Sequence, residues 1–215
     1  MSELSLKVKD IKQSFRLMMD GKTSTSMREK GLHYHLNWGV SLPMLQEMAL
    51  TLKKEHEQLA QEYTLYDLAI SLWKEDVREC KILATMLMPP LEMLPEVCDI
   101  WMEQIPSQEI AEQVAFNTWQ HLPYIAEKAY QWISSHQEYY LICGFHVLSR
   151  LFMRGMSPNE RGINEYLDQA LIALQDERLS VRKAALQSLH HFSELGLMHS
   201  RLTKSAMKSV NLDFF

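Results

Sequence analysis

The stretch SQEIAEQVAFNTWQHL, residues 107–122, lies near the middle of the chain and decides the fold. Its apolar residues recur every three or four positions, which predicts one helix from Ser107 to Leu122. Ser107 is suited to cap the N-terminus of this helix, and Glu109 favours the positive end of its dipole. Segments with the same spacing lie on both sides, so this helix belongs to a series.

The series consists of helix pairs. Four second helices begin near Val77, Ser107, Glu138 and Leu179, at intervals of about 30, 31 and 41 residues. Such a period is typical of α-solenoids, because one pair cannot bury its apolar face without stacked neighbours. The pattern predicts an all-α fold, an α-α superhelix of HEAT/armadillo-like repeats with a concave face.

The chain is expected to form a single helical-repeat domain over residues 1–215. Residues 1–62 hold N-terminal helices, of which the first is predicted to stop at Gly21 and a later one to start after Ser41. Residues 63–196 hold the regular helix pairs, with Thr64 and Asp67 forming a capping box. Residues 197–215 are predicted to be a C-terminal helix and tail.

The net charge and the length of the apolar stretches indicate which cellular compartment and which binding partners to expect. The formal charge of −5 and the pI of about 6.0 are not the global signature of a nucleic-acid binder, although a local basic face stays open. No stretch approaches the ~18 apolar residues that span a membrane, and no secretory leader is visible. A cytoplasmic protein without a membrane partner is expected.

The cysteines and histidines argue against a disulfide framework or a metal centre. Cys80, Cys98 and Cys143 are odd in number and match no CxxC pattern, so buried thiols in a reducing compartment are expected. Adjacent His190 and His191 point to different faces of a helix and have no convincing further ligands. No metal and no cofactor are therefore expected.

Several sequence segments, taken in their order along the chain, resemble those of a known family. The segments are MREKGLHYHLNWGVSLPMLQEMA at 27–49, LAISLWKEDVRECKILATML at 68–87, AEQVAFNTW at 111–119, LICGFHVLSRLF at 141–152 and SVRKAALQSL at 180–189. From about Phe15 to Gly196, the chain is similar to the AlkD-like DNA alkylation repair proteins, which are HEAT-repeat DNA glycosylases.

The resemblance implies that DNA lies against a basic concave face and that alkylated bases are excised without extrusion into a pocket. Aromatic side chains would attract the cationic lesion. A carboxylate would stabilise the oxocarbenium-like sugar and position water.

Active members use a tryptophan, an aspartate four residues later, an arginine on the next inner helix and a tryptophan on the last. The resemblance places these positions at Gln108, Glu112, Ile142 and Gln187. Three of the four are changed in chemical type. Glu112 keeps the charge, but its extra methylene moves the carboxylate by roughly 1 Å, and such a misplacement can cost about 100-fold in rate.

Basic residues on or beside the expected inner helices are candidates for phosphate contacts, and polar residues there could touch nucleotides. The candidates are Gln108, Arg78, Arg150, Arg154, Arg178, Arg182, Lys183 and Gln187. The plainer alternative is a solvated surface of mixed charge, and Glu112 could equally be an ordinary solvated glutamate.

The sequence therefore favours a DNA-structure-binding relative with lost or weak glycosylase chemistry. One alternative is an active glycosylase for cationic N3- or N7-alkylpurines that uses Glu112. Another is a non-enzymatic protein-interaction scaffold. Duplex or structured DNA is the expected partner of a monomer, a protein partner stays open, and a non-enzyme is preferred.

Overall fold

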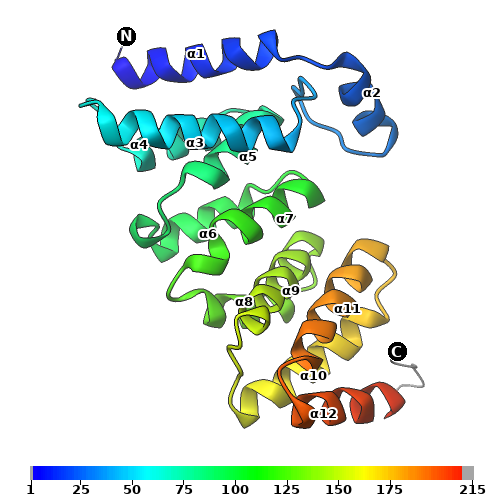
Figure 1. Ribbon diagram of the computed structural model, residues 1–215. Helices are drawn as coiled ribbons and strands as arrows, with labels where there is room; N and C mark the ends of the chain where they lie inside the picture. Colours follow the sequence, from blue (N-terminus) through cyan, green and yellow to red (C-terminus); the bar gives the residue numbers. More distant parts are fainter. Residues whose placement is uncertain (1, 210–215) are drawn as a thin grey trace. The chain divides into compact units, whose positions relative to one another are not determined.

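A computed structural model describes residues 2–209 of the chain (Figure 1). Over these residues the regular elements are α-helices and two short 3-10 helices, with one isolated bridge between Leu36 and Val77. The prediction of an all-α fold is confirmed. The expected tail beyond Ser209 lies outside the described residues.

The chain is divided into two compact units, Met1–Ile100 and Trp101–Phe215. The boundary falls within helix α6 (Pro95–Glu103). The single domain expected over residues 1–215 stays a prediction.

The first unit consists of helices of the N-terminal hundred residues. They are α1 (Glu3–Leu17), α2 (Gly21–Glu29), α3 (Leu42–Gln58), α4 (Leu65–Lys74), α5 (Arg78–Leu87) and the 3-10 helix η1 (Pro90–Glu92). Helices α4 and α5 pair, α3 packs on α5, and α1 packs on α4. The capping box of Thr64 and Asp67 is present as predicted, with each side chain accepting a backbone N–H of the other residue.

Gly21 does not stop the first helix. Helix α1 ends at Leu17, and Asp20 then caps α2 because its carboxylate accepts the N–H groups of Lys22 and Thr23. Gly21 is the first residue of α2. The prediction placed a C-terminal glycine where an aspartate N-cap begins a new helix.

The second unit holds the remaining helices. They are α7 (Gln108–Asn117), the 3-10 helix η2 (Trp119–His121), α8 (Ile125–Ile133), α9 (Glu138–Met153), α10 (Glu160–Leu174), α11 (Leu179–Ser193) and α12 (Leu197–Ser209). Helix α9 is its centre, because α7, α8 and α11 all pack against it.

Aromatic side chains fill the core between α9, α10 and α11. The rings of Phe152, Tyr166 and Phe192 lie with centroids 4.9–5.3 Å apart, within the range of favourable aromatic pairs. The Tyr166 hydroxyl donates to Ser188 Oγ at 2.9 Å, which satisfies a fully buried polar group.

Close backbone approach between α8 and α9 depends on Gly144. A Cβ at this position would lie 2.7 Å from Ile133 Cγ2 and 3.0 Å from the carbonyl oxygen of Ala129. Helix α9 can therefore lie this near α8 only without a side chain there.

The helix predicted from Ser107 to Leu122 is interrupted. Helix α7 ends at Asn117, Thr118 is its C-cap at φ −119° and ψ −61°, and the 3-10 helix η2 follows. This turn buries Trp119 against Trp132, with ring centroids 4.7 Å apart. The helix is therefore interrupted where the Trp119 ring packs into the core. The spacing of apolar residues alone does not reveal this interruption.

The three cysteines, Cys80, Cys98 and Cys143, are buried as expected. Burial raises the pKa of the Cys80 thiol to about 12.

Within residues 2–209, no helix combines the length and apolar character needed to cross a membrane.

Candidate nucleic-acid interface

Two helices of the second unit present matching rows of side chains. Gln108, Glu112 and Phe116 are four residues apart on α7, and His146 and Arg150 are four residues apart on α9, so each set follows one helix face. Gln120 lies beyond the end of α7, in η2, and Arg154 is the C-cap of α9. Their members meet in register, with His146 beside Glu112, Arg150 over Phe116, and Arg154 donating to the carbonyl oxygen of Gln120. We call this set the α7–α9 row: Gln108, Glu112, Phe116, Gln120, His146, Arg150 and Arg154.

Local capping and packing fix the start of the α7 side of the row. Ser107 Oγ accepts the N–H of Ile110 at 3.3 Å and so caps α7. Ala111 and Val114 are fully buried on the opposite stripe. Since 3.6 residues make one turn, Gln108 and Glu112 then lie next to each other on the accessible side.

Glu112 is an accessible and oriented carboxylate. Its side chain is 41% exposed, and Gln108 Nε2 donates to its Oε1 at 2.7 Å. The glutamine amide therefore occupies the side of the carboxylate where the family resemblance places an aromatic ring in active members.

His146 faces Glu112 from α9. Its Nε2 lies 3.9 Å from Glu112 Oε1, which is too far for a hydrogen bond. Burial, and to a smaller extent the charge of Arg150, lowers the pKa of His146 to about 4. The imidazole is therefore neutral near pH 7 and supplies no counter-charge to Glu112.

The position matched to the family arginine is apolar. Ile142 is fully buried in the core, and it is His146, one turn later, that reaches Glu112. Sequence reasoning did not single out His146. Its position four residues after Ile142 is the signal that could have found it, because residues so spaced share one helix face.

Arg150 is the cation best placed to meet a ligand. Its guanidinium carbon lies 4.5 Å from the centroid of the Phe116 ring, and its Nη1 donates to Met153 Sδ at 3.6 Å. Partial burial lowers the pKa of Arg150, yet arginine stays charged in any practical range. The guanidinium has five N–H donors, so it can also bind a phosphate.

Helix α11 contributes exposed residues near α9. Lys183 and Gln187 are exposed, whereas Arg182 donates to the carbonyl oxygens of Asp176 and Glu177 at 2.6 and 2.9 Å. Arg182 thereby stiffens the turn before α11.

Arg178 is neutralised locally. Its guanidinium contacts both oxygens of Asp176 at 2.8 and 2.6 Å. Hydrogen bonding from Arg178 lowers the pKa of Asp176 to about 2. A phosphate would compete with this carboxylate, so Arg178 is a weaker candidate than Arg150.

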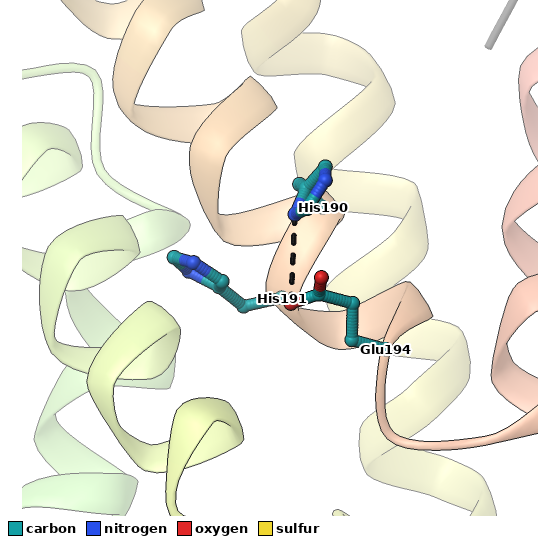
Figure 2. Close-up of side chains that lie close together, drawn as sticks. All are labelled: His190, His191 and Glu194. Carbon is teal, nitrogen blue, oxygen red and sulfur yellow. Dashed lines mark ion pairs between the residues drawn. The ribbon is translucent and has the colours of Figure 1, made fainter. Parts of the chain in front are cut away.

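One group in the second unit has the chemistry of metal ligands. Ligand atoms of His190, His191 and Glu194 lie within 4.8 Å of one another. Figure 2 shows the two rings diverging, as expected for neighbours on a helix, with His190 Nδ1 3.6 Å from Glu194. His191 Nδ1 lies 2.6 Å from Ser149 Oγ and is already engaged. The expectation of no metal stays a prediction.

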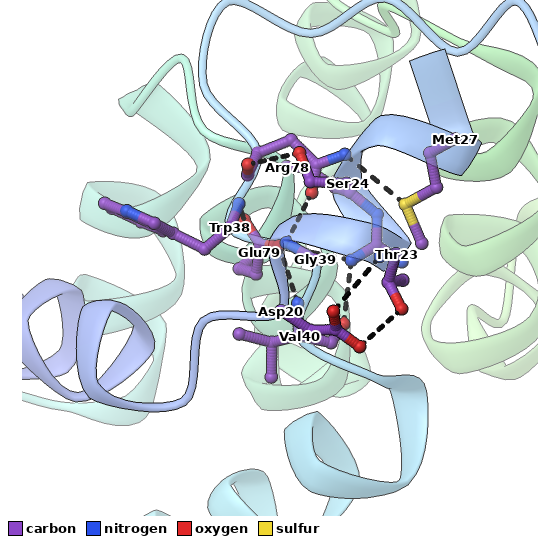
Figure 3. A network of polar contacts seen from close by, with 10 residues as sticks. Asp20, Thr23, Ser24, Met27, Trp38, Gly39, Val40, Arg78 and Glu79 are labelled. Atoms are coloured by element: carbon purple, nitrogen blue, oxygen red, sulfur yellow. Dashed lines mark hydrogen bonds and ion pairs between the residues drawn. The ribbon is translucent and has the colours of Figure 1, made fainter. Parts of the chain in front are cut away.

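Arg78 is part of the interior of the first unit (Figure 3). It is 1% exposed, and its Nη1 donates to the carbonyl oxygen of Val40 at 2.9 Å and to Glu79 Oε1 at 3.3 Å. Glu79 in turn accepts the N–H groups of Trp38 and Val40. This buried network holds the segment before α3, and it leaves Arg78 out of reach of a phosphate.

The same segment requires a glycine. Gly39 has φ +75°, and a Cβ there would lie 2.3 Å from the carbonyl oxygen of Asp20. Only glycine fits this left-handed position beside the start of α2.

The sequence matches the family model described as DNA alkylation repair enzyme over residues 11–196. The chain therefore belongs to the DNA alkylation repair enzyme family. No curated protein sequence matches it.

A solved structure shares the fold. It is described as a new family of proteins related to the HEAT-like repeat DNA glycosylases with affinity for branched DNA structures. The TM-score is 0.78 at 16% sequence identity, covering 94% of this chain and 82% of that one. The likeness confirms the prediction of a HEAT-like helical fold.

Proposed function

We propose that this chain binds structured DNA through the α7–α9 row, and that it has lost most of the glycosylase chemistry of its family. The α7–α9 row carries the proposal: two arginines, one of them over an exposed aromatic ring, line an accessible face of a DNA alkylation repair family fold. The affinity of the related solved structure for branched DNA supports DNA as the ligand.

The basic residues of this face suit phosphate contacts. Arg150 lies in the last turn of α9, Arg154 caps the end of this helix, and Lys183 is exposed on the neighbouring α11. Since the net charge of the whole chain is −5, binding must depend on this local concentration of cations. A monomeric, cytoplasmic protein belongs to the same proposal.

The chemistry of the face argues against efficient excision. Gln108 has no aromatic ring to attract a cationic base, and buried Ile142 cannot contact a substrate. The nearby imidazole of His146 is neutral near pH 7. The carboxylate of Glu112 thus lacks the aromatic and cationic partners that active members use.

Binding is tested with fluorescently labelled duplex and four-way-junction DNA at low and moderate salt. We expect salt-sensitive binding by the wild type, and about tenfold weaker binding by Arg150→Gln with Arg154→Gln at low salt. The matched control is Arg161→Gln with Lys204→Gln, which removes two exposed cations from α10 and α12. Equal losses in the two double variants would assign the effect to overall charge and contradict the proposed surface.

A second candidate function, DNA glycosylase activity, is supported by Glu112, which is accessible and held by Gln108. In an active glycosylase this carboxylate would stabilise the developing charge on the sugar. Release of 7-methylguanine from duplex DNA measures this activity. Release that Glu112→Gln abolishes would replace our proposal, whereas binding without release would support it.

A further inference from the structure

We infer that Phe116 and Arg150 form a stacking site for an unpaired nucleobase, of the kind exposed at a DNA branch point. This inference rests on the proposed function and extends it from phosphate contacts to recognition of DNA form.

Phe116 is an apolar ring on an otherwise polar face. It is 43% exposed, Glu112 lies one turn before it on α7, and Gln120 of η2 donates to its carbonyl oxygen. Leaving a large ring in water has a cost that a bound apolar surface would recover.

The aromatic ring is paired with a cation that nucleic acids also bind. Arg150 lies over one face of the ring, 4.5 Å from its centroid, so a base that packs against the exposed part of Phe116 lies next to a guanidinium. Aromatic rings and arginine together form the usual platform for single-stranded bases, because every base has a π face. A paired base inside a duplex has no open face and cannot use this platform.

Neighbouring contacts hold the platform in place. His146 and Glu112 lie on one side of it, and Arg154 donates to the Gln120 carbonyl on the other. Arg150 is further held by Met153 Sδ. Such restraint reduces the ordering cost when a base binds.

The test compares Phe116→Leu with Phe116→Trp. Leucine keeps apolar volume without a π face, whereas tryptophan keeps the π face. The probes are two DNAs of equal length, a perfect duplex and a three-way junction with two unpaired bases, one of them 2-aminopurine. Circular dichroism checks folding, and Ile172→Ala on α10, an exposed apolar residue, is the control.

We expect Phe116→Leu to weaken junction binding by at least about fivefold and to leave duplex binding within about twofold. Tryptophan should restore the affinity, and the change in 2-aminopurine fluorescence on binding should be absent only in the leucine variant. Unchanged junction binding by Phe116→Leu, with salt-sensitive binding intact, would overturn the stacking site and leave the proposed function standing. Absence of DNA binding by the wild type would overturn both.

Discussion

At the scale of single residues, His146 shows how packing decides chemistry. A histidine four residues after Ile142 could have replaced the family arginine as a cation near Glu112. Burial instead lowers its pKa to about 4, so the replacement is a neutral ring. The family resemblance placed two functional positions at Gln108 and Glu112, and the structure brings these side chains together. Sequence reasoning could not give the protonation state of His146, which depends on burial between helices.

His146 should make stability depend on pH. Its pKa is lowered on folding from an ordinary value near 6.5, so between pH 6.5 and 4 the unfolded chain binds more protons than the folded one. Stability is therefore lost as pH falls through this window, by about 3 kcal/mol at most. Urea unfolding at pH 7, 5.5 and 4.5 should show that His146→Gln loses less stability than the wild type. His33→Gln, at an exposed position, should follow the wild type, and equal slopes for all three proteins would contradict the prediction.

At the scale of elements, helix spacing predicted the series of pairs because each helix buries one apolar stripe. The second helices α5, α7, α9 and α11 begin within one residue of the expected positions. The end of α7 was missed, since Trp119 is apolar and fits the helical period whether or not the helix continues. Arg78 was misread for a similar reason: its charge suggested a surface, whereas Glu79 and Val40 hold it inside.

The contact between α8 and α9 gives a prediction for Gly144. Substitution by alanine places a Cβ against Ile133 and the Ala129 backbone, and overpacking of this kind costs about 1–3 kcal/mol. Gly21→Ala is the matched control, because no atom lies within 4 Å of its Cβ position and the change should add about 0.4–1 kcal/mol. Chemical denaturation measures both, and an unaffected Gly144→Ala would show that α8 and α9 can separate freely.

At the scale of the whole molecule, the net negative charge of the chain repels DNA, whereas the local basic residues attract it. The concave surface expected from the repeats stays a prediction. The α7–α9 row is defined within the second unit alone, so the proposed contact does not depend on the first unit.

Salt dependence counts the phosphates that are bound. Each contact releases counterions and adds roughly 0.9 to the slope of log K against log salt. Loss of Arg150 and Arg154 by glutamine substitution should therefore reduce the slope by about 2. The slope is obtained from duplex affinities at four or more salt concentrations. If the double substitution leaves the slope of log K against log salt unaltered, cations other than Arg150 and Arg154 contact the phosphates.

The buried cysteines make the protein a ready host for spectroscopic probes. Thiol reagents attack thiolates that solvent can reach, and Cys80, Cys98 and Cys143 offer neither access nor, for Cys80, ionisation below about pH 12. A single cysteine introduced at exposed Gln187 would thus take a spin label or dye with few side reactions. Labelling of the native thiols over time would report how often the surrounding helices open.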